Sequence, residues 1–439
     1  MLWSAALGDQ PADTVELDLL LAAGAPDPEL LAAAERSAAE RSPEDWRLLA
    51  ELRMAEDSAL APARTAHAAL EEQLAGLEMP RTPVLVELPA DKRRTTHVLI
   101  KGNFLVPGDV VEASVPAALH PWPKGQPHDR LGLARWLTDA RSPLTARVAV
   151  NRLWARLFGR GLVATEEDFG NQGSPPTHPA LLDHLALGFQ RSGWDQKALL
   201  RRLVTSATYR QTSAQDPARG SIDPGNRWLS RGPRVRLEAE MVRDVALVAS
   251  GLFSPTVGGP SIFPPQPEGL WQAAFNGQRS WIESQGPDRY RRGLYVFLRR
   301  SIPYPAMDAF DVPNREICNA RRIATNTPLQ ALVTLNDPAF VELAQGLARR
   351  MYAAGDSAVE RAAFGLRETL VRPADPFDMQ IVARLVDAER AAGRSTEESI
   401  SLACDPLGPL AEGQDPAELA AWTVAASVLL NQDAVLTKQ

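Results

Sequence analysis

The sequence predicts a mainly α-helical protein, in which a small antiparallel β segment precedes a multi-helix domain that contains short strands of its own. Apolar residues recur at three- and four-residue steps along most of the 439-residue chain, which is the spacing of helices with one buried face. Runs that favour β structure are confined to residues 81–120 and to a few short stretches beyond them. No apolar run reaches the roughly eighteen residues that a membrane-spanning helix needs.

Residues 1–80 form an acidic segment with helical spacing. Within it, Ser42 and Pro43 have the residue types of a helix start, a capping hydroxyl followed by proline at the first helical position. The first residues carry acids early and lack a basic run, so we expect no signal peptide.

A β-rich segment over residues 81–120 follows. Strands are expected at Val84–Leu88 and Thr95–Ile100, separated by a polar turn. The prolines between residues 116 and 127 form a stiff connector, which we take as a domain boundary. The remaining chain, residues 121–439, is predicted to be one helical domain.

Charge is divided unevenly along the chain. The net charge of −7 combines −11 in residues 1–90, +11 in residues 91–350 and −7 in residues 351–439, and only five of the basic residues are lysines. A basic middle region can attract anions such as phosphate, sulfate or a carboxylated polymer. The alternative is compositional bias, since a GC-rich genome also produces chains rich in Ala, Arg, Pro and Gly.

The stretch Ser142–Leu185 concentrates polar side chains between two predicted helices. Ser142 has the residue type of a helix cap, and Gly159 ends that helix because glycine takes a left-handed backbone cheaply. Five side chains are candidates for lining a polar pocket at the helix ends: Arg147, Asn151, Asp168, Asn171 and His178. The alternative is that these residues hold loop carbonyls and cap helices.

Further along, a long helix is expected from Arg234 and a short strand at Leu294–Leu298, whereas Gly258–Pro267 must be a loop held by its surroundings or by a ligand. Thr327 and Pro328 form a helix start. Side chains that can bind sugars, bases or anions are also found here, namely Tyr209, Trp271, Arg315, Arg321, Arg322 and Asn326. Core packing is the alternative role for the tryptophan.

Several long motifs occur in one order: VNRLWARLFGRGLVATEEDFGNQGSPPTHPALLDHLA, DPGNRWLSRGPRVRLEAEMVRD, GGPSIFPPQPEGLW and ATNTPLQALVTLNDPAFVE. In these motifs the chain resembles planctomycete-specific domain one, the domain of unknown function 1553, with core motifs over residues 129–350. The resemblance implies a secreted or periplasmic protein whose relatives carry haem c in an upstream cytochrome domain. This chain has no CxxCH motif, so we expect no haem in it and interpret residues 1–80 as a remnant of an upstream domain.

The sequence contains no P-loop, GxGxxG, HExxH, GxSxG or EF-hand motif. His178 and His184 are six residues apart and share a helix face poorly, so no metal site is expected. The two cysteines, Cys318 and Cys404, are too few for a disulfide framework.

Three hypotheses about function remain open. The first is a binding module that takes an anionic or carbohydrate ligand in a cleft lined by Arg, Asn and Asp. The second is a docking module for an acidic partner domain or an anionic polymer. The third is a carbohydrate-processing hydrolase that uses a pair of carboxylates from Asp168, Asp308 and Asp311. Nucleic-acid binding is not expected, because no basic tail or recognised motif supports it.

Overall fold

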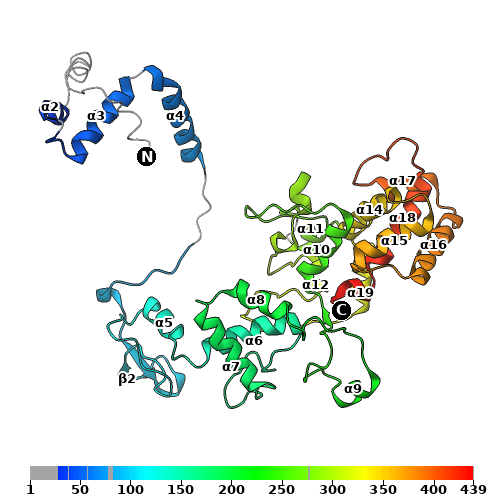
Figure 1. Cartoon of the computed structure of the whole chain (residues 1–439), viewed down its shortest axis with the longest axis horizontal. Coiled ribbons are helices and arrows are strands. Elements are labelled where there is room, and N and C mark those ends of the chain that lie inside the picture. Colours follow the sequence, from blue (N-terminus) through cyan, green and yellow to red (C-terminus); the bar gives the residue numbers. More distant parts are fainter. Residues whose placement is uncertain (1–27, 38, 57, 78–82, 275–276, 439) are drawn as a thin grey trace. The chain divides into compact units, whose positions relative to one another are not determined.

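The structure is a computed structural model, and it describes residues 28–37, 39–56, 58–77, 83–274 and 277–438. These residues are mainly helical with two small antiparallel sheets of two strands each, which confirms the predicted fold class. They fall into two compact units, Met1–Arg94 and Thr95–Gln439. Figure 1 follows both units along the chain. In the described part of the chain, no helix combines the length and the apolar character that crossing a membrane requires.

The described residues of the first unit form three helices, α2 (Pro28–Glu35), α3 (Pro43–Glu56) and α4 (Ala61–Gly76), and two short 3₁₀ turns, η1 (Ser58–Leu60) and η2 (Ala90–Lys92). The predicted helix start at Ser42 is confirmed. The Asp45 N–H donates to Ser42 Oγ at 3.2 Å, and the Ser42 N–H donates to Asp45 Oδ2 at 2.7 Å. This reciprocal pair satisfies two backbone donors at the start of α3. Residues 1–27 of the predicted acidic segment lie outside the described residues.

The predicted strand at Val84–Leu88 was wrong. These residues have no regular secondary structure, and their apolar side chains are exposed. A β-favouring run becomes a strand only where a neighbouring strand supplies hydrogen bonds and packing. None of the strands in the described residues pairs with residues 84–88.

The second unit opens with a β-hairpin in which β1 (Thr96–Leu99) pairs antiparallel with β2 (Pro107–Val111). The 3₁₀ turn η3 (Ile100–Gly102) starts the connection between them. Thr96 faces Val111 and Leu99 faces Pro107, with an irregularity between His97 and Leu99. The strand predicted at Thr95–Ile100 is therefore confirmed.

A first group of helices, the α6–α8 group, follows the hairpin and α5 (Arg130–Leu137). It consists of α6 (Thr145–Phe158), α7 (Pro179–Arg191) and α8 (Gln196–Val204). Its core contains Val150, Trp154, Phe158, Leu162, Val163, Leu182, Leu185, Phe189, Leu199 and Leu203. Gly159 ends α6 in the left-handed conformation at φ 75°, as its residue type predicts. Ser142 does not cap this helix, because its hydroxyl bonds the Thr145 hydroxyl at 3.0 Å.

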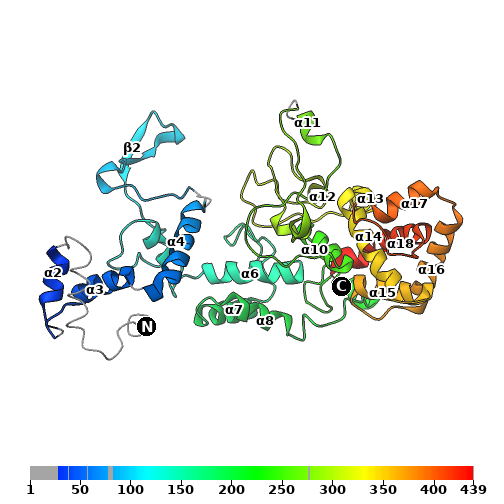
Figure 2. The same ribbon diagram turned by 90° about the horizontal axis from the view of Figure 1, so that it is seen from above.

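A second group, the α10–α19 group, is built on two buried helices, α14 (Pro338–Ala353) and α18 (Pro416–Leu430). Around them lie α10 (Ala239–Ser250), α12 (Pro305–Ala309), α13 (Pro328–Asn336), α15 (Ala358–Leu370), α16 (Pro376–Ala391), α17 (Thr396–Cys404) and α19 (Asp433–Leu436). In both views α6, α7 and α8 lie side by side, and α14 to α18 form the second group (Figure 1 and Figure 2).

Two predictions for the second group have different outcomes. The helix start at Thr327 and Pro328 is confirmed, although the Thr327 side chain makes no capping hydrogen bond. The helix expected from Arg234 begins only at Ala239. Val235 and Arg236 instead form the strand β3, which pairs with β4 (Thr437–Lys438). A strand made by a partner about two hundred residues away leaves no local pattern.

The loop Gly258–Pro267 is held by the protein itself. The buried Arg291 side chain donates to the carbonyl oxygens of Gly258 and Pro260. Tyr304 Oη donates to Pro265 O at 2.6 Å, and Trp281 Nε1 donates to Pro264 O at 2.7 Å. The loop also contacts Val296, where a 3₁₀ turn and an isolated bridge replace the strand predicted at Leu294–Leu298. The other short elements of the connections are α9 (Pro217–Ile222), α11 (Leu270–Ala274), η4 (Gly286–Tyr290) and η5 (Gly293–Tyr295).

The C-terminal strand joins the two helical groups. Val235 faces Lys438 and Arg236 faces Thr437 in the β3–β4 pair, which anchors the strand to the α10–α19 group. The Lys438 ammonium then reaches the α6–α8 group, where it donates to Leu157 O at 3.3 Å and lies 3.5 Å from the centre of the Tyr209 ring. The space beside this connection is the candidate site.

Candidate functional site

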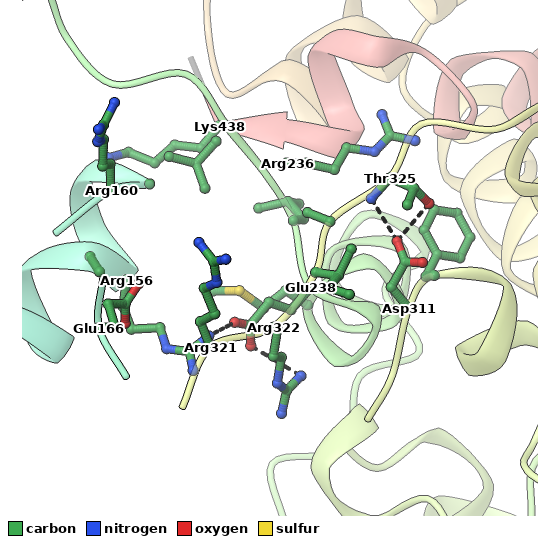
Figure 3. A pocket seen from close by; sticks show the side chains of 18 of the residues that line it. Arg156, Arg160, Glu166, Arg236, Glu238, Asp311, Arg321, Arg322, Thr325 and Lys438 are labelled. Carbon is green, nitrogen blue, oxygen red and sulfur yellow. Dashed lines mark hydrogen bonds and ion pairs between the residues drawn. The ribbon is translucent and has the colours of Figure 1, made fainter. Parts of the chain in front are cut away.

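A cavity of about 580 Å³ lies where the α6–α8 group meets the α10–α19 group. Its walls come from the end of α6 and the loop after it, from β3 and the start of α10, from residues 310–311 and 321–325, and from β4. Junctions between packed bodies are common places for ligand sites. We call it the central cavity. Its charged lining side chains are Arg156, Arg160, Glu166, Arg236, Glu238, Asp311, Arg321, Arg322 and Lys438 (Figure 3).

Ion pairs fix one wall of the central cavity. Arg322 lies 2.6 Å and 3.1 Å from the two carboxylate oxygens of Glu240, and 3.1 Å from Glu238. Arg156 also pairs with Glu238. Burial acts to raise the pKa of Glu240, but the hydrogen bonds and charge of Arg322 outweigh it, so this pKa lies below its usual value. Arg156 and Arg322 are therefore largely neutralised by the protein.

Arg236 projects from β3 and is held more loosely. It donates to Gln330 Oε1 at 2.8 Å and lies 3.4 Å from Asp433, while its Nε is buried without a partner among the described residues. The side chain is only 14% exposed. Burial lowers the pKa of Arg236, against the attraction of Asp433 and Asp311, which raises it. An arginine has five N–H donors, so this one retains capacity for another acceptor.

Asp311 stands on the wall opposite α6 (Figure 3). Its Oδ2 accepts from the Thr325 N–H and from Thr325 Oγ1, both at 2.7 Å. Gln330 then donates to Thr325 O at 3.2 Å. This chain of contacts fixes the segment that carries Arg321 and Arg322.

Glu166 is a half-buried carboxylate on the α6 side of the cavity (Figure 3). In the described part of the chain its carboxylate has no hydrogen-bond partner or ion pair within bonding distance. Burial raises the pKa of Glu166, although the charges of Arg156 and Arg321 oppose the shift. A carboxyl group with a raised pKa in a cavity is typical of a functional site.

Three cationic side chains in the cavity have weaker ion pairs than the others, or none within the described residues. Arg160 is exposed, and none of the described residues forms an ion pair or side-chain hydrogen bond with it. Arg321 is 60% exposed and lies 3.8 Å from Glu167, a distance at which an exposed pair contributes little. Lys438 contacts a backbone carbonyl and an aromatic ring, and no carboxylate in the described part of the chain pairs with it.

The structure brings together some of the sequence-predicted site residues. Asp311, Arg321 and Arg322 line the central cavity. Tyr209 lies directly beneath Lys438 and packs edge-on against Phe158. Arg315 does not line the cavity, although it is near enough for its charge to lower the pKa of Glu240.

The residues predicted around α6 lie elsewhere. Arg147 and Asn171 line a separate shallow groove, in which Arg147 Nε lies 2.6 Å from Asp183. Asn151 is 0% exposed and exchanges two hydrogen bonds of 2.9 Å with the backbone of Val163. Asp168 accepts the Gly170 N–H at 2.7 Å and so shapes its own turn.

The other predicted residues also lie outside the central cavity. The His178 ring contacts the Thr177 hydroxyl at 3.0 Å and packs edge-on against Trp228. Trp271 is buried in an aromatic cluster with Trp281 and Phe297. The side chains of Asp308 and Asn326 are exposed.

Sequence reasoning missed six of the charged residues that line the cavity: Arg156, Arg160, Glu166, Arg236, Glu238 and Lys438. Glu166 stands two positions before Asp168, the residue of the same loop that was predicted instead. Lys438 had no local indication at all, because only the β3–β4 pairing brings it to the site.

Comparison with known proteins gives one match. Residues 129–386 match the family described as PSD1, protein of unknown function (DUF1553), and this stretch is more than half of the chain. No curated protein and no solved structure matches. Within the described residues, no group of three or more His, Cys, Asp or Glu side chains is arranged to hold a metal ion.

Proposed function

The chain belongs to the PSD1 family of proteins of unknown function (DUF1553), and for this member we propose that the central cavity binds an acidic carbohydrate, a sugar that carries carboxylate or sulfate groups. The observation that carries the proposal is the imbalance of charge in the cavity. Six cationic side chains line it against three carboxylates. Two of those carboxylates, Glu238 and Asp311, are already engaged by protein donors.

The surplus charge is available to a ligand. Arg160, Arg321 and Lys438 have weak or no carboxylate partners in the described residues and face the same space. Guanidinium groups form strong, directional hydrogen bonds with carboxylate and sulfate-like oxygens. A volume of about 580 Å³ is also within the ordinary range for a small-ligand pocket.

The docking alternative is less favoured by the same cavity. A surface that only receives a partner domain needs no concave space lined by cations with weak or no carboxylate partners, whereas a small acidic ligand does. The hydrolase alternative depends on a pair of aspartates near the ligand. Only Asp311 of the three candidates lines the cavity, and Thr325 already occupies one of its oxygens. Binding is therefore the stronger proposal.

A matched set of polymers tests the proposal. Dextran sulfate, carboxymethyl dextran and neutral dextran share one backbone and differ in charge, so their binding at fixed ionic strength isolates the acidic group. A ligand that binds only the folded chain raises its unfolding temperature. We expect a rise with one or both acidic polymers and none with neutral dextran.

The variant Arg321→Gln locates the binding. Loss of one charge-assisted contact should weaken affinity by about tenfold. The control is Arg390→Gln, which removes the same charge from an exposed position on α16 that does not line the cavity. Equal effects of the two variants, or equal binding of neutral dextran, would overturn the proposal.

A further inference from the structure

A second cavity of about 810 Å³ adjoins the first. The two cavities share Gly159, Arg160 and Gly161 as a common wall. We call the second one the arginine basin, because among the described residues five arginines line it and no carboxylate does. These arginines are Arg160, Arg227, Arg231, Arg234 and Arg372.

Not all five are equally free. Arg231 donates to the carbonyl oxygens of Asp223 and Pro224, and Arg234 pairs with Asp433. The other three, Arg160, Arg227 and Arg372, are exposed, and none of the described residues accepts a hydrogen bond from their guanidinium groups. Three such cations around one acid-free cavity repel one another unless an anion lies between them.

The loop that presents Arg227 is fixed in advance. Asn226 and Leu229 adopt left-handed backbone at φ 49° and 58°, which costs energy for residues other than glycine. The buried Asp223 carboxylate offsets this cost by accepting the N–H groups of Arg227 and Trp228 at 2.9 and 2.7 Å. Because the Asp223 carboxylate is turned toward this backbone, Asp223 does not line the basin.

The rest of the basin suits a sugar chain better than a nucleic acid. Beside the arginines stand hydroxyl and amide side chains, those of Gln211, Thr212, Ser213 and Gln215. The aromatic rings in its wall, Trp154 and Phe158, are buried and stacked on each other at 4.0 Å. They offer no exposed face for the base stacking on which single-stranded nucleic-acid binding relies.

We propose that the arginine basin is a second anion subsite, and that the ligand is an acidic polysaccharide chain that spans both cavities and passes Arg160 at their junction. This inference rests on the proposed function, because it extends the ligand of the central cavity. Two linked contacts raise affinity through effective concentration, so chain length becomes part of recognition.

The test compares a short and a long sulfated probe by titration calorimetry. Sucrose octasulfate fills one cavity, and dextran sulfate can span both. We expect two sucrose octasulfate molecules per wild-type chain and one per chain of the Arg227→Gln/Arg372→Gln double variant. We also expect the double variant to lose about tenfold in affinity for dextran sulfate. Arg372 lies outside the Asp223–Arg231 loop, so the single variant Arg372→Glu tests the basin without altering that loop. It should also bind one sucrose octasulfate molecule per chain instead of two.

Each outcome decides between the two proposals. If Arg321→Gln weakens binding but the double variant binds like wild type, the second subsite is wrong and the central cavity stands. If neither variant differs from the Arg390→Gln control, both proposals fail. Tighter binding of an oligothymidylate than of dextran sulfate at equal salt would replace the polysaccharide with a nucleic acid. Unchanged unfolding temperatures establish that each variant is folded.

Discussion

The Asp311 carboxylate accepts two hydrogen bonds from Thr325, one from the backbone N–H and one from the hydroxyl, each at 2.7 Å. The pair joins the segment after α12 to the segment before α13, and both residues line the central cavity. Asp311 itself has a left-handed backbone with φ of 59°. Such a conformation costs an aspartate about 1 kcal/mol or more, so the two bonds hold a strained residue in place.

Removal of the Thr325 hydroxyl should therefore lower the stability of the folded chain, although the change in side-chain size is small. Thr325→Val keeps the shape of the side chain but leaves the Asp311 carboxylate with one donor fewer. We expect a loss of about 1–3 kcal/mol in the free energy of unfolding, measured by denaturant titration. Thr325→Ser, which retains the hydroxyl, should remain within about 0.5 kcal/mol of wild type. Equal stability of the two variants would show that the hydroxyl contact does not hold this wall.

A buried ion pair in the second unit predicts a larger loss. Glu342 on α14 is 2% exposed and accepts from Arg289 Nε at 2.9 Å and from Tyr290 Oη at 2.6 Å. Arg289 also pairs with Glu283 at 2.6 Å, so Glu342→Ala leaves it one carboxylate and leaves the Tyr290 hydroxyl without its acceptor. We expect a loss of about 3 kcal/mol, the low end for breaking a buried pair. Denaturant unfolding measures the loss.

The matched control for this prediction is Glu368→Ala. Glu368 pairs with Arg350 at 2.7 Å, but both side chains are about one-third exposed. Water screens such a pair, so its loss should cost less than about 1 kcal/mol. Similar losses in the two variants would mean that burial of Glu342 is not what makes its pair important.

Asp337 predicts a pH dependence of stability. It caps α14 by accepting the Ala339 N–H at 3.0 Å, and burial raises its pKa to about 6. The N–H groups of Ala339 and Phe340 and the charge of Arg243 oppose the shift. Between about pH 4 and 6 the folded chain therefore binds this proton more tightly than the unfolded chain does. The stability from Asp337 is full below this window and is lost as the pH rises through it.

The variant Asp337→Asn isolates that effect. Asparagine also caps helices well but does not ionise. Relative to wild type, its free energy of unfolding should improve by about 2 kcal/mol between pH 4.5 and pH 7.5. Parallel pH profiles of variant and wild type would contradict the raised pKa.

The sequence predicts features that depend on neighbours in the chain. The α13–α14 break at Asn336–Pro338 follows from proline, which removes a backbone donor and suits the first turn of a helix. The end of α6 at Gly159 follows from glycine in the same local way. Such features need no knowledge of the fold.

The candidate site is hard to predict for the opposite reason. Arg147 and Asn151 are four residues apart and therefore lie on the same side of a helix. The spacing does not predict that Asn151 is buried and bonds the backbone of Val163, because this depends on how α6 packs against the loop after it. Lys438 and Arg236 enter the cavity only through the β3–β4 pair, whose strands are far apart in the sequence. The charge balance of a cavity depends on which of its arginines form ion pairs with carboxylates. The spacing of residues in the sequence does not predict these pairs.

Glu166 yields the prediction that best separates binding from catalysis. If the central cavity binds an acidic ligand, the Glu166 carboxylate repels it when ionised. Glu166→Gln should then strengthen dextran sulfate binding by roughly three- to tenfold in calorimetry, because a like charge beside the ligand is removed. Since burial raises the pKa of Glu166, the affinity of wild type should also increase as the pH falls through that pKa, and the variant should lack this increase.

The control for this change is Glu412→Gln, which alters the net charge equally at an exposed position that lines neither cavity. It should leave affinity unchanged, so any gain in Glu166→Gln reflects the local field rather than total charge.

The opposite result is equally informative. Weaker binding in Glu166→Gln would mean that this carboxyl group contacts the ligand directly. A protonated carboxyl with a raised pKa at a sugar is what a hydrolase needs as its general acid, so the preference for binding over hydrolysis would then reverse.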